Sequence, residues 1–252
     1  MSAKLLLSIL TLGGCAFASP IGTLGIGSTG VVDATLTSIL FTPDPAALGV
    51  CPGGPCNGDV NTGTTLAFAG GPLTTGEGIL INGGLAFGTP PPPGATSFNP
   101  YLQFAFHPNL LFIITGVDPG SANTNCAGLA NGQSCSINVA GTPSPVLLTR
   151  NGTNTNVSIS IFGIADDGTG PSTWSGGFSA TIPNQTPLQI VQFFCGTDAV
   201  CTAAEAAASP TLAVRSTSGS FFASTVPEPS SSVLLGVGLV LLSLTLRRVK
   251  VV

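Results

Sequence analysis

The clearest strand signal is Val157-Ser158-Ile159-Ser160-Ile161-Phe162, in which apolar and polar residues alternate from Val157 to Ile161. The side chains of a strand point alternately to its two faces, so Val157, Ile159 and Ile161 would line one face and hydroxyl groups the other. Weaker strand signals, separated by Gly, Pro and Asn clusters, occur at 31–41, 64–69, 78–81, 101–106, 110–117, 134–139, 174–182 and 211–222. Their spacing predicts an all-β domain, a β-sandwich of jelly-roll-like form.

Two short helices are expected before the last strand. Thr186-Pro187 is typical of an N-cap followed by proline at the first helical position, and the next apolar residues would form one helix face. The alanine-rich stretch 201–208 predicts a second helix. Pro90 to Pro93 favour an extended segment, which would either divide two domains or form a long loop between strands of one sandwich.

The charge of the region 19–225 is unusual, because nine acidic residues are opposed only by Arg150 and Arg215 and it contains no lysine. Such a surface cannot neutralise phosphates, so nucleic acid is excluded as an expected partner. Abundant Gly, Ser, Thr and Asn would give solubility through hydroxyl and amide groups. That surface suits a polysaccharide matrix and equally suits any secreted β protein.

Six cysteines in this region form three pairs that are close in sequence, namely Cys51 with Cys56, Cys126 with Cys135, and Cys195 with Cys201. An even number at short spacing in an exported chain indicates disulfides. The connectivity is open from spacing alone, but closing the shortest loops costs the least entropy and favours the three local pairs. No spacing here resembles a zinc site.

The amino terminus predicts export. Lys4 precedes an apolar stretch, and Ala16 and Ala18 supply the small residues that signal peptidase needs before Ser19, so residues 1–18 would be a signal peptide. Lipoprotein processing at Cys15 is the alternative, since the residues before it loosely resemble a lipobox.

The carboxyl terminus predicts a membrane helix. Residues 230–246 are 17 consecutive uncharged residues, which as a helix would measure about 25 Å, near the lower limit for crossing a bilayer. Arg247, Arg248 and Lys250 follow directly, and a basic cluster of this kind holds its end in the cytoplasm. The preceding region 19–225 would therefore lie outside as an ectodomain.

The segment 226–252 also resembles a known signal. Val226-Pro227-Glu228-Pro229, the apolar helix, and Arg247 with Arg248 occur in the order of the PEP-CTERM protein-sorting signal of Gram-negative bacteria. The resemblance implies that exosortase, a membrane-embedded transpeptidase, recognises Pro227, Glu228 and Pro229, removes the helix and passes the protein to the cell surface or exopolysaccharide matrix. It covers about a tenth of the chain and implies nothing about an ectodomain activity.

Catalytic signatures are missing from the sequence. His107 is the only histidine and precedes Pro108, as expected of a loop or strand end, and no GxSxG or P-loop is present. Asp166-Asp167-Gly168 predicts a surface turn, with a calcium-binding loop as the alternative. Trp174 and Tyr101 are expected in the core or at a sheet edge, but an exposed Trp174 beside Asp166 and Asp167 would be the best candidate for a carbohydrate contact.

These observations predict an exported, non-enzymatic surface or extracellular-matrix protein without metal or cofactor. It would be anchored first at the outer face of the inner membrane. A carbohydrate- or calcium-binding adhesion module is the alternative, and a hydrolase built around His107 is the third class.

Overall fold

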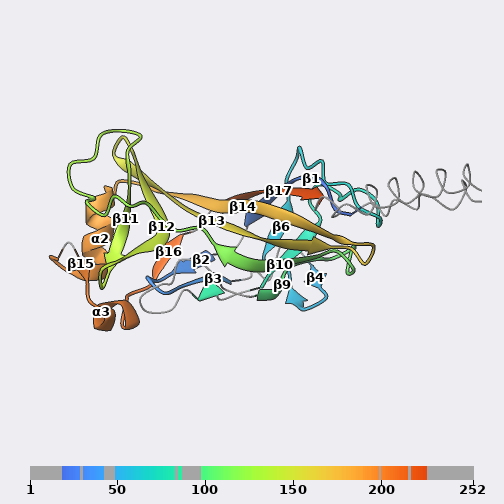
Figure 1. Cartoon of the computed structure of the whole chain (residues 1–252), viewed down its shortest axis with the longest axis horizontal. Coiled ribbons are helices and arrows are strands. Elements are labelled where there is room, and N and C mark those ends of the chain that lie inside the picture. Colours follow the sequence, from blue (N-terminus) through green and yellow to red (C-terminus); the bar gives the residue numbers. More distant parts are fainter. Residues whose placement is uncertain are drawn as a thin grey trace, which may run out of the picture.

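The computed structural model describes residues 19–28, 31–42, 49–82, 85–86, 98–198, 200–214 and 217–225. Most of these residues form strands, which confirms the all-β prediction (Figure 1). The expected signal peptide 1–18, Cys15, the prolines 90–93 and the sorting segment 226–252 lie outside the described residues.

The principal feature is a closed, barrel-like sheet of eight strands. Neighbouring strands pair in a ring, and β10 also pairs with β13 to close it. In order around the ring the strands are β10 (Leu111–Val117), β9 (Phe98–Phe104), β7 (Gly78–Ile81), β6 (Gly58–Val60), β1 (Gly22–Ser28), β17 (Thr217–Thr225), β14 (Pro171–Ile182) and β13 (Asn154–Asp166).

The length of β13 explains the closure. Its first half pairs with β12 (Thr142–Asn151), while its second half, from Ile161 to Asp166, pairs with β10. The prediction of a jelly-roll-like sandwich is therefore wrong for the main sheet. Pairing β10 with β13 satisfies two rows of backbone N–H and C=O groups that an open sandwich would leave as edges.

A second sheet packs against the amino-terminal half of β13 and the carboxy-terminal half of β14. It contains β16 (Leu212–Val214), β2 (Val31–Ala34), β3 (Ser38–Thr42) and β8 (Leu85–Ala86), in that order. Phe41 of β3 contacts Phe178 of β14 with ring centroids 4.9 Å apart. A small apolar pocket of about 50 Å³ lies between the two layers, so sheets pack face to face here although the main sheet is closed.

The expected strand 31–41 is a hairpin of β2 and β3. The Thr35 hydroxyl accepts hydrogen bonds from the backbone N–H groups of Thr37 and Ser38, and the Thr35 N–H donates to the Ser38 carbonyl. A side chain that offers the backbone a local partner favours a turn over a continuous strand.

The prediction of a strand at 64–69 is wrong. Within this range only Ala67 pairs in the manner of a strand, through an isolated bridge with Ile21.

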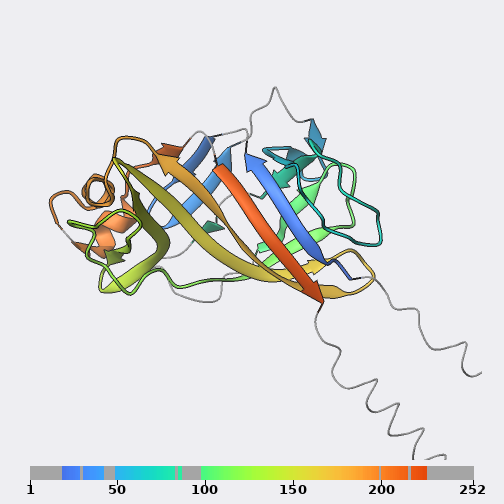
Figure 2. The ribbon, with the colours of Figure 1, turned by 90° about the horizontal axis from the view of Figure 1, so that it is seen from above.

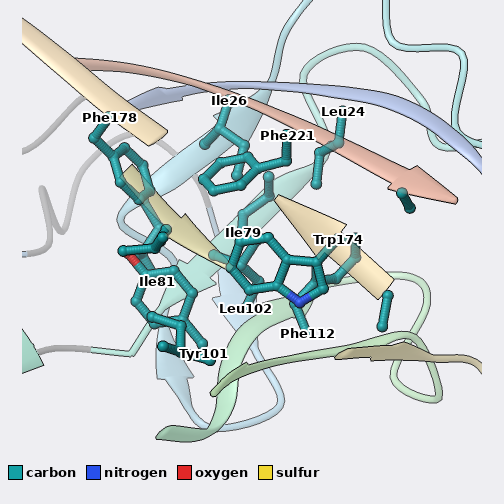
Figure 3. Packing of buried hydrophobic residues seen from close by; sticks show 14 of the residues in the cluster. Leu24, Ile26, Ile79, Ile81, Tyr101, Leu102, Phe112, Trp174, Phe178 and Phe221 are labelled. Carbon is teal, nitrogen blue, oxygen red and sulfur yellow. The ribbon is translucent and has the colours of Figure 1, made fainter. Parts of the chain in front are cut away.

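The interior of the closed sheet is filled with side chains. Ile159 and Ile161 of β13 are buried in this core, as the alternation predicted. Trp174, Phe178 and Phe221 belong to the same cluster, and Phe221 contacts both of the other rings (Figure 3). Gly163 makes room for the Trp174 indole, since a Cβ there would collide with the Ile113 carbonyl oxygen and crowd the indole nitrogen. Truncating a buried ring such as Phe221 to alanine typically costs about 3–5 kcal/mol.

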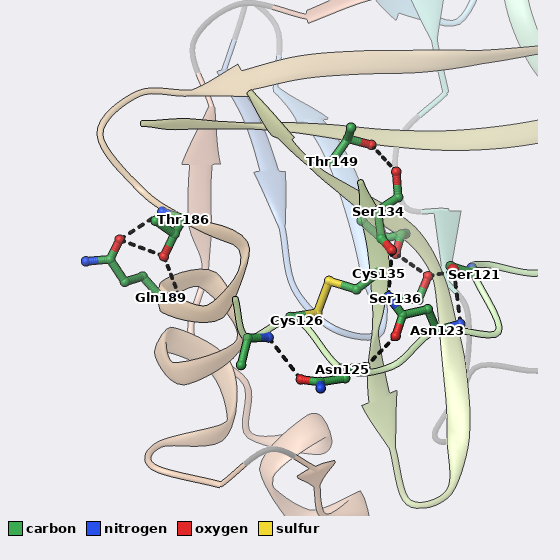
Figure 4. Close-up of a disulfide and its surroundings, with 12 residues drawn as sticks. Ser121, Asn123, Asn125, Cys126, Ser134, Cys135, Ser136, Thr149, Thr186 and Gln189 are labelled. Carbon is green, nitrogen blue, oxygen red and sulfur yellow. Dashed lines mark hydrogen bonds between the residues drawn. A yellow bond between two sulfur atoms is a disulfide. The ribbon is translucent and has the colours of Figure 1, made fainter. Parts of the chain in front are cut away.

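A second apolar cluster covers the end of β12 and its neighbour β11 (Ser134–Val139). Helix α2 (Pro187–Cys195) begins at Thr186, whose side chain forms a capping box with Gln189 (Figure 4). Helix α3 (Ala203–Ala207) begins likewise at Thr202, after β15 (Val200–Cys201). Both helices were expected from the sequence, and α2 has its predicted N-cap.

Both ends of the described domain lie at the same end of the closed sheet. Strands β1 and β17 are antiparallel neighbours, with Gly22 opposite Ala223, so β1 begins where β17 ends (Figure 2). The turn between β13 and β14 is also here, because Ser172 lies opposite Thr225. We call this the terminal end; helices α2 and α3 lie at the opposite end (Figures 1 and 2).

Candidate functional site

A hollow at the terminal end brings together three segments that are distant in sequence. The β9–β10 turn contributes Phe106 and His107, the β13–β14 turn contributes Asp167, and Phe68 comes from a loop. The hollow measures about 300 Å³. It contains the only histidine and one of the two aspartates that the sequence singled out.

Glu77 holds His107 in place. The Glu77 side chain is buried, and its Oε1 atom is 2.9 Å from His107 Nδ1 and accepts a hydrogen bond from the Phe106 N–H at 3.0 Å. The Thr74 N–H donates to Oε2 at 3.4 Å, and the His107 ring lies edge-on to Phe68. The carboxylate thus fixes one ring nitrogen of His107 and leaves the other as a second donor or acceptor.

An oriented imidazole can act as a general base, but it needs a nucleophile within reach. Among the described residues that line the hollow, none is a serine, threonine or cysteine. The hydrogen bonds between Glu77 and His107 therefore connect two turns. The described lining of the hollow does not combine this histidine with a nucleophile. No sequence pattern marks Glu77 as a partner of His107, because the two meet only when β7 and β9 pair.

Asp166 and Asp167 form the expected turn and point apart. Asp166 Oδ1 accepts a hydrogen bond from the Gly168 N–H at 2.8 Å. Asp167 is buried: its Oδ1 accepts from the Thr169 hydroxyl at 2.6 Å and the Thr169 N–H at 3.0 Å, and its Oδ2 accepts from the Ala69 N–H at 2.7 Å.

These contacts decide the protonation of Asp167. Burial alone would raise the pKa of this carboxyl, but the hydrogen bonds from Thr169 and Ala69 favour the ionised form and bring the pKa below its ordinary value. Both oxygens already have protein partners. No group of three potential metal ligands occurs among the described residues, so the calcium-loop alternative gains no support from this turn.

Trp174 is in the core, as the sequence predicted, and is only 2% exposed, so the condition for a carbohydrate contact is not met. The indole N–H donates to the Ile113 carbonyl at 3.2 Å, and the ring packs among Tyr101, Phe112 and Phe221. Tyr101 is buried as well. Neither ring offers a face on which a sugar could stack.

The three disulfides join the local pairs that the sequence favoured. Cys51 and Cys56 close the hairpin of β4 (Val50–Cys51) and β5 (Gly54–Pro55). Cys126–Cys135 ties a loop to β11 (Figure 4), and Cys195–Cys201 joins the end of α2 to β15. The last two pairs are buried in the second apolar cluster, so they hold loops against a core that other side chains also form.

The outer face of β13, β14 and β17 carries hydroxyl groups in register across the strands. Ser158 lies opposite Ser179, which in turn lies opposite Ser218. The Ser179 and Ser218 hydroxyls are 3.4 Å apart, and the Thr181 hydroxyl donates to Asn156 Oδ1 at 3.0 Å. The alternation in β13 predicted this hydroxyl face, and the strand pairing extends it into an uncharged surface.

The remaining predicted sites cannot be described in the same way. Val226, Pro227, Glu228, Pro229, Arg247, Arg248, Ala16 and Ala18 lie outside the described residues, whereas Ser19 is within them. No helix within the described part of the chain is long and apolar enough to span a membrane.

Comparisons with protein-family models, curated proteins and solved structures give no match. The fold and its cross-links define the class as a disulfide-linked, all-β domain.

Proposed function

We propose that this protein is an exported, non-enzymatic component of the cell surface or extracellular matrix. A carboxy-terminal PEP-CTERM signal would first hold it in the inner membrane and then direct its sorting by an exosortase. The proposal draws on the ordered sequence features after Thr225: Val226 to Pro229, the uncharged stretch 230–246, and Arg247 with Arg248.

The single structural observation that carries the proposal is the position of the chain's exit. β17 ends at the terminal end, beside the start of β1. An anchor attached there would direct the helical end away from the membrane and leave the hydroxyl face along the side of the domain. A domain held at one end in this way can present most of its surface to a matrix.

Two further observations support the proposal. Three disulfides are expected in an oxidising compartment and are rare in the cytosol. His107 is engaged by Glu77 in a hollow whose described lining contains no nucleophile, which favours a non-enzymatic role.

The alternative is a carbohydrate-binding adhesion module, which the hydroxyl face favours. Serine, threonine and asparagine side chains can hydrogen-bond a neutral glycan without stacking. A glycan array with the purified protein tests this alternative. Binding that disappears in a Ser179→Leu, Ser218→Leu variant would favour it, whereas silence across neutral glycans would remove it. Calorimetry with Ca²⁺ tests the calcium form of the same alternative.

The sorting proposal predicts the fate of the protein in its native cells. We expect the wild-type protein to begin at Ser19, to lack the carboxy-terminal helix, and to be found outside the cell. A Glu228→Ala variant should keep the helix and stay in the membrane fraction, because it lacks the motif's only charged side chain. Intact mass measurement after cell fractionation checks both outcomes.

An Asp198→Ala variant is the control, since it removes an exposed acidic side chain that lies well before the motif in the sequence. It should be sorted like the wild type. If the Glu228→Ala variant behaves identically to the wild type and both keep the helix, the tail is a plain membrane anchor and the sorting proposal fails.

A further inference from the structure

The outer face of the closed sheet changes character along its strands. Away from the terminal end, the outward residues of β13, β14 and β17 carry hydroxyl or amide groups or are glycine. Near the terminal end, four large apolar side chains point outward instead. They are Ile21 at 45% exposure, Phe162 at 37%, Ile164 at 38% and Phe222 at 55%, and we call them the end patch.

The strand pairing brings the end patch together. Phe162 and Phe222 lie on either side of Ser175, which is opposite both of them, and Ile164 lies opposite Thr173 on β14. Ile21 directly precedes Gly22, the first β1 residue to pair with β17. The small residues between the apolar ones leave an outer hollow of about 480 Å³ that includes Phe162, Ile164 and Phe222 in its lining.

The end patch is next to the point where the chain continues towards the apolar stretch 230–246. Phe222 is three residues before Thr225, and only Val226 to Pro229 separate Thr225 from Ser230. The five residue steps from Thr225 to Ser230 span at most about 18 Å even when fully extended. A bilayer that holds residues 230–246 must therefore lie close to the terminal end for as long as that stretch stays attached.

The charges near the end patch indicate how it would meet a membrane. Asp167 and Glu77 are buried and accept hydrogen bonds from the protein, and Asp166 is half-buried. Arg150 is the only arginine or lysine that the structure describes, and it lies far away on β12, where it donates to the Leu129 carbonyl. His107, at the terminal end, is paired with the buried Glu77 carboxylate. Attraction to anionic headgroups is therefore not available, and contact would depend on burying apolar side chains at the interface.

We propose that the end patch lies against the phospholipid bilayer that holds the carboxy-terminal stretch, so that the domain docks on the lipid by its terminal end. This inference rests on the proposed anchoring. The bilayer is favoured over a second copy as the occupant because the short connection keeps the membrane beside the patch, whereas no comparable tether holds a second copy there.

The test uses the full chain reconstituted into phosphatidylcholine vesicles, with and without brominated acyl chains that quench tryptophan. The reporter is Phe222→Trp in the end patch, and the matched control is Phe193→Trp on α2 at the opposite end, where Phe193 is 42% exposed. Both substitutions exchange one exposed ring for another. The one native tryptophan, Trp174, contributes the same background to both variants.

We expect the emission gained in Phe222→Trp to be quenched by brominated lipid and that gained in Phe193→Trp to be unaffected. The quenching should persist at high salt, because no charge attraction contributes. Quenching that is absent or equal in both variants overturns the docking. Light scattering of the protein in detergent is the second measurement, and a dimer that shields the Phe222→Trp side chain from an aqueous quencher also overturns it.

Vesicle flotation separates this inference from the function on which it rests. If the protein floats with the vesicles but the reporter is not quenched, the anchoring stands and the docking is wrong. If the wild-type protein does not float, the proposed anchoring fails and the docking fails with it.

Discussion

At the scale of single residues, Asp167 connects the β13–β14 turn to the loop at Ala69 through a buried carboxylate. We expect Asp167→Asn to lower the free energy of unfolding by about 1–3 kcal/mol at neutral pH, because an amide cannot replace both acceptor oxygens. The pKa of Asp167 is lowered in the folded state. Its stabilisation is therefore complete above the ordinary aspartate pKa and disappears as pH falls through the folded value.

Urea unfolding of the wild type and Asp167→Asn over a series of acidic pH values checks this prediction. The difference between the two proteins should shrink towards low pH. Asp166→Asn is the control and should cost less, since Asp166 accepts one exposed hydrogen bond. A difference for Asp167→Asn that is the same at every pH would contradict the assigned role of its charge.

Tyr101 gives a second prediction at this scale. Its hydroxyl is buried and has no hydrogen-bond partner among the described residues, and burial raises the pKa of the phenol. We expect Tyr101→Phe to raise the free energy of unfolding by about 1 kcal/mol, because an unsatisfied buried hydroxyl costs roughly 1–3 kcal/mol. Thermal unfolding of the wild type and Tyr101→Phe checks this prediction. A variant that is clearly less stable than the wild type would contradict it and would show that the hydroxyl has a partner.

Residues that interact with sequence neighbours could be predicted, and those that meet distant partners could not. The cysteine pairs are separated by 5, 9 and 6 positions, so local closure identified them. Glu77 and His107 are 30 residues apart and meet through strand pairing. Trp174 was expected in the core and lies there, but the partners that enclose it, such as Ile113 and Phe221, are distant in sequence and could not be named.

At the scale of elements, the capping box of α2 is open to test. Thr186 accepts a hydrogen bond from the Gln189 N–H, and the Gln189 side chain accepts one from the Thr186 N–H. Thr186→Ala should lower the free energy of unfolding by about 1 kcal/mol, since it leaves a helix N–H without its partner. Thr153→Ala, at an exposed turn, is the control and should be nearly neutral in the same urea titration.

The elements found from sequence have clear local signals. β7 and β11 match the expected ranges, and α2 begins after its predicted cap. β1 was not predicted, because Gly22, Gly25 and Gly27 interrupt its apolar pattern. These glycines lie where a neighbouring loop approaches: a Cβ at Gly22 would collide with the Thr65 carbonyl oxygen. Close approach of a distant segment therefore explains a strand that local preference disfavours.

At the scale of the whole molecule, the strand content could be predicted but the closure of the sheet could not. The alternation of apolar and polar residues in β13 predicts which side chains lie on each face of the strand. It does not predict which strands pair with the two edges of β13. That choice depends on β13 being long enough to pair with both β12 and β10. Register and closure are properties of pairs of strands, so one sequence pattern leaves both open.

The position of β17 has a mechanical consequence. Any pull on the chain beyond Thr225 acts along β17, which is hydrogen-bonded to β14 on one side and to β1 on the other. These bonds run perpendicular to the strand, so a pull along β17 against a held opposite end loads both ladders in shear. Strands that slide must break many bonds together, whereas strands that peel break them one at a time. The domain is therefore built to bear tension through the same strand that connects it to its tail.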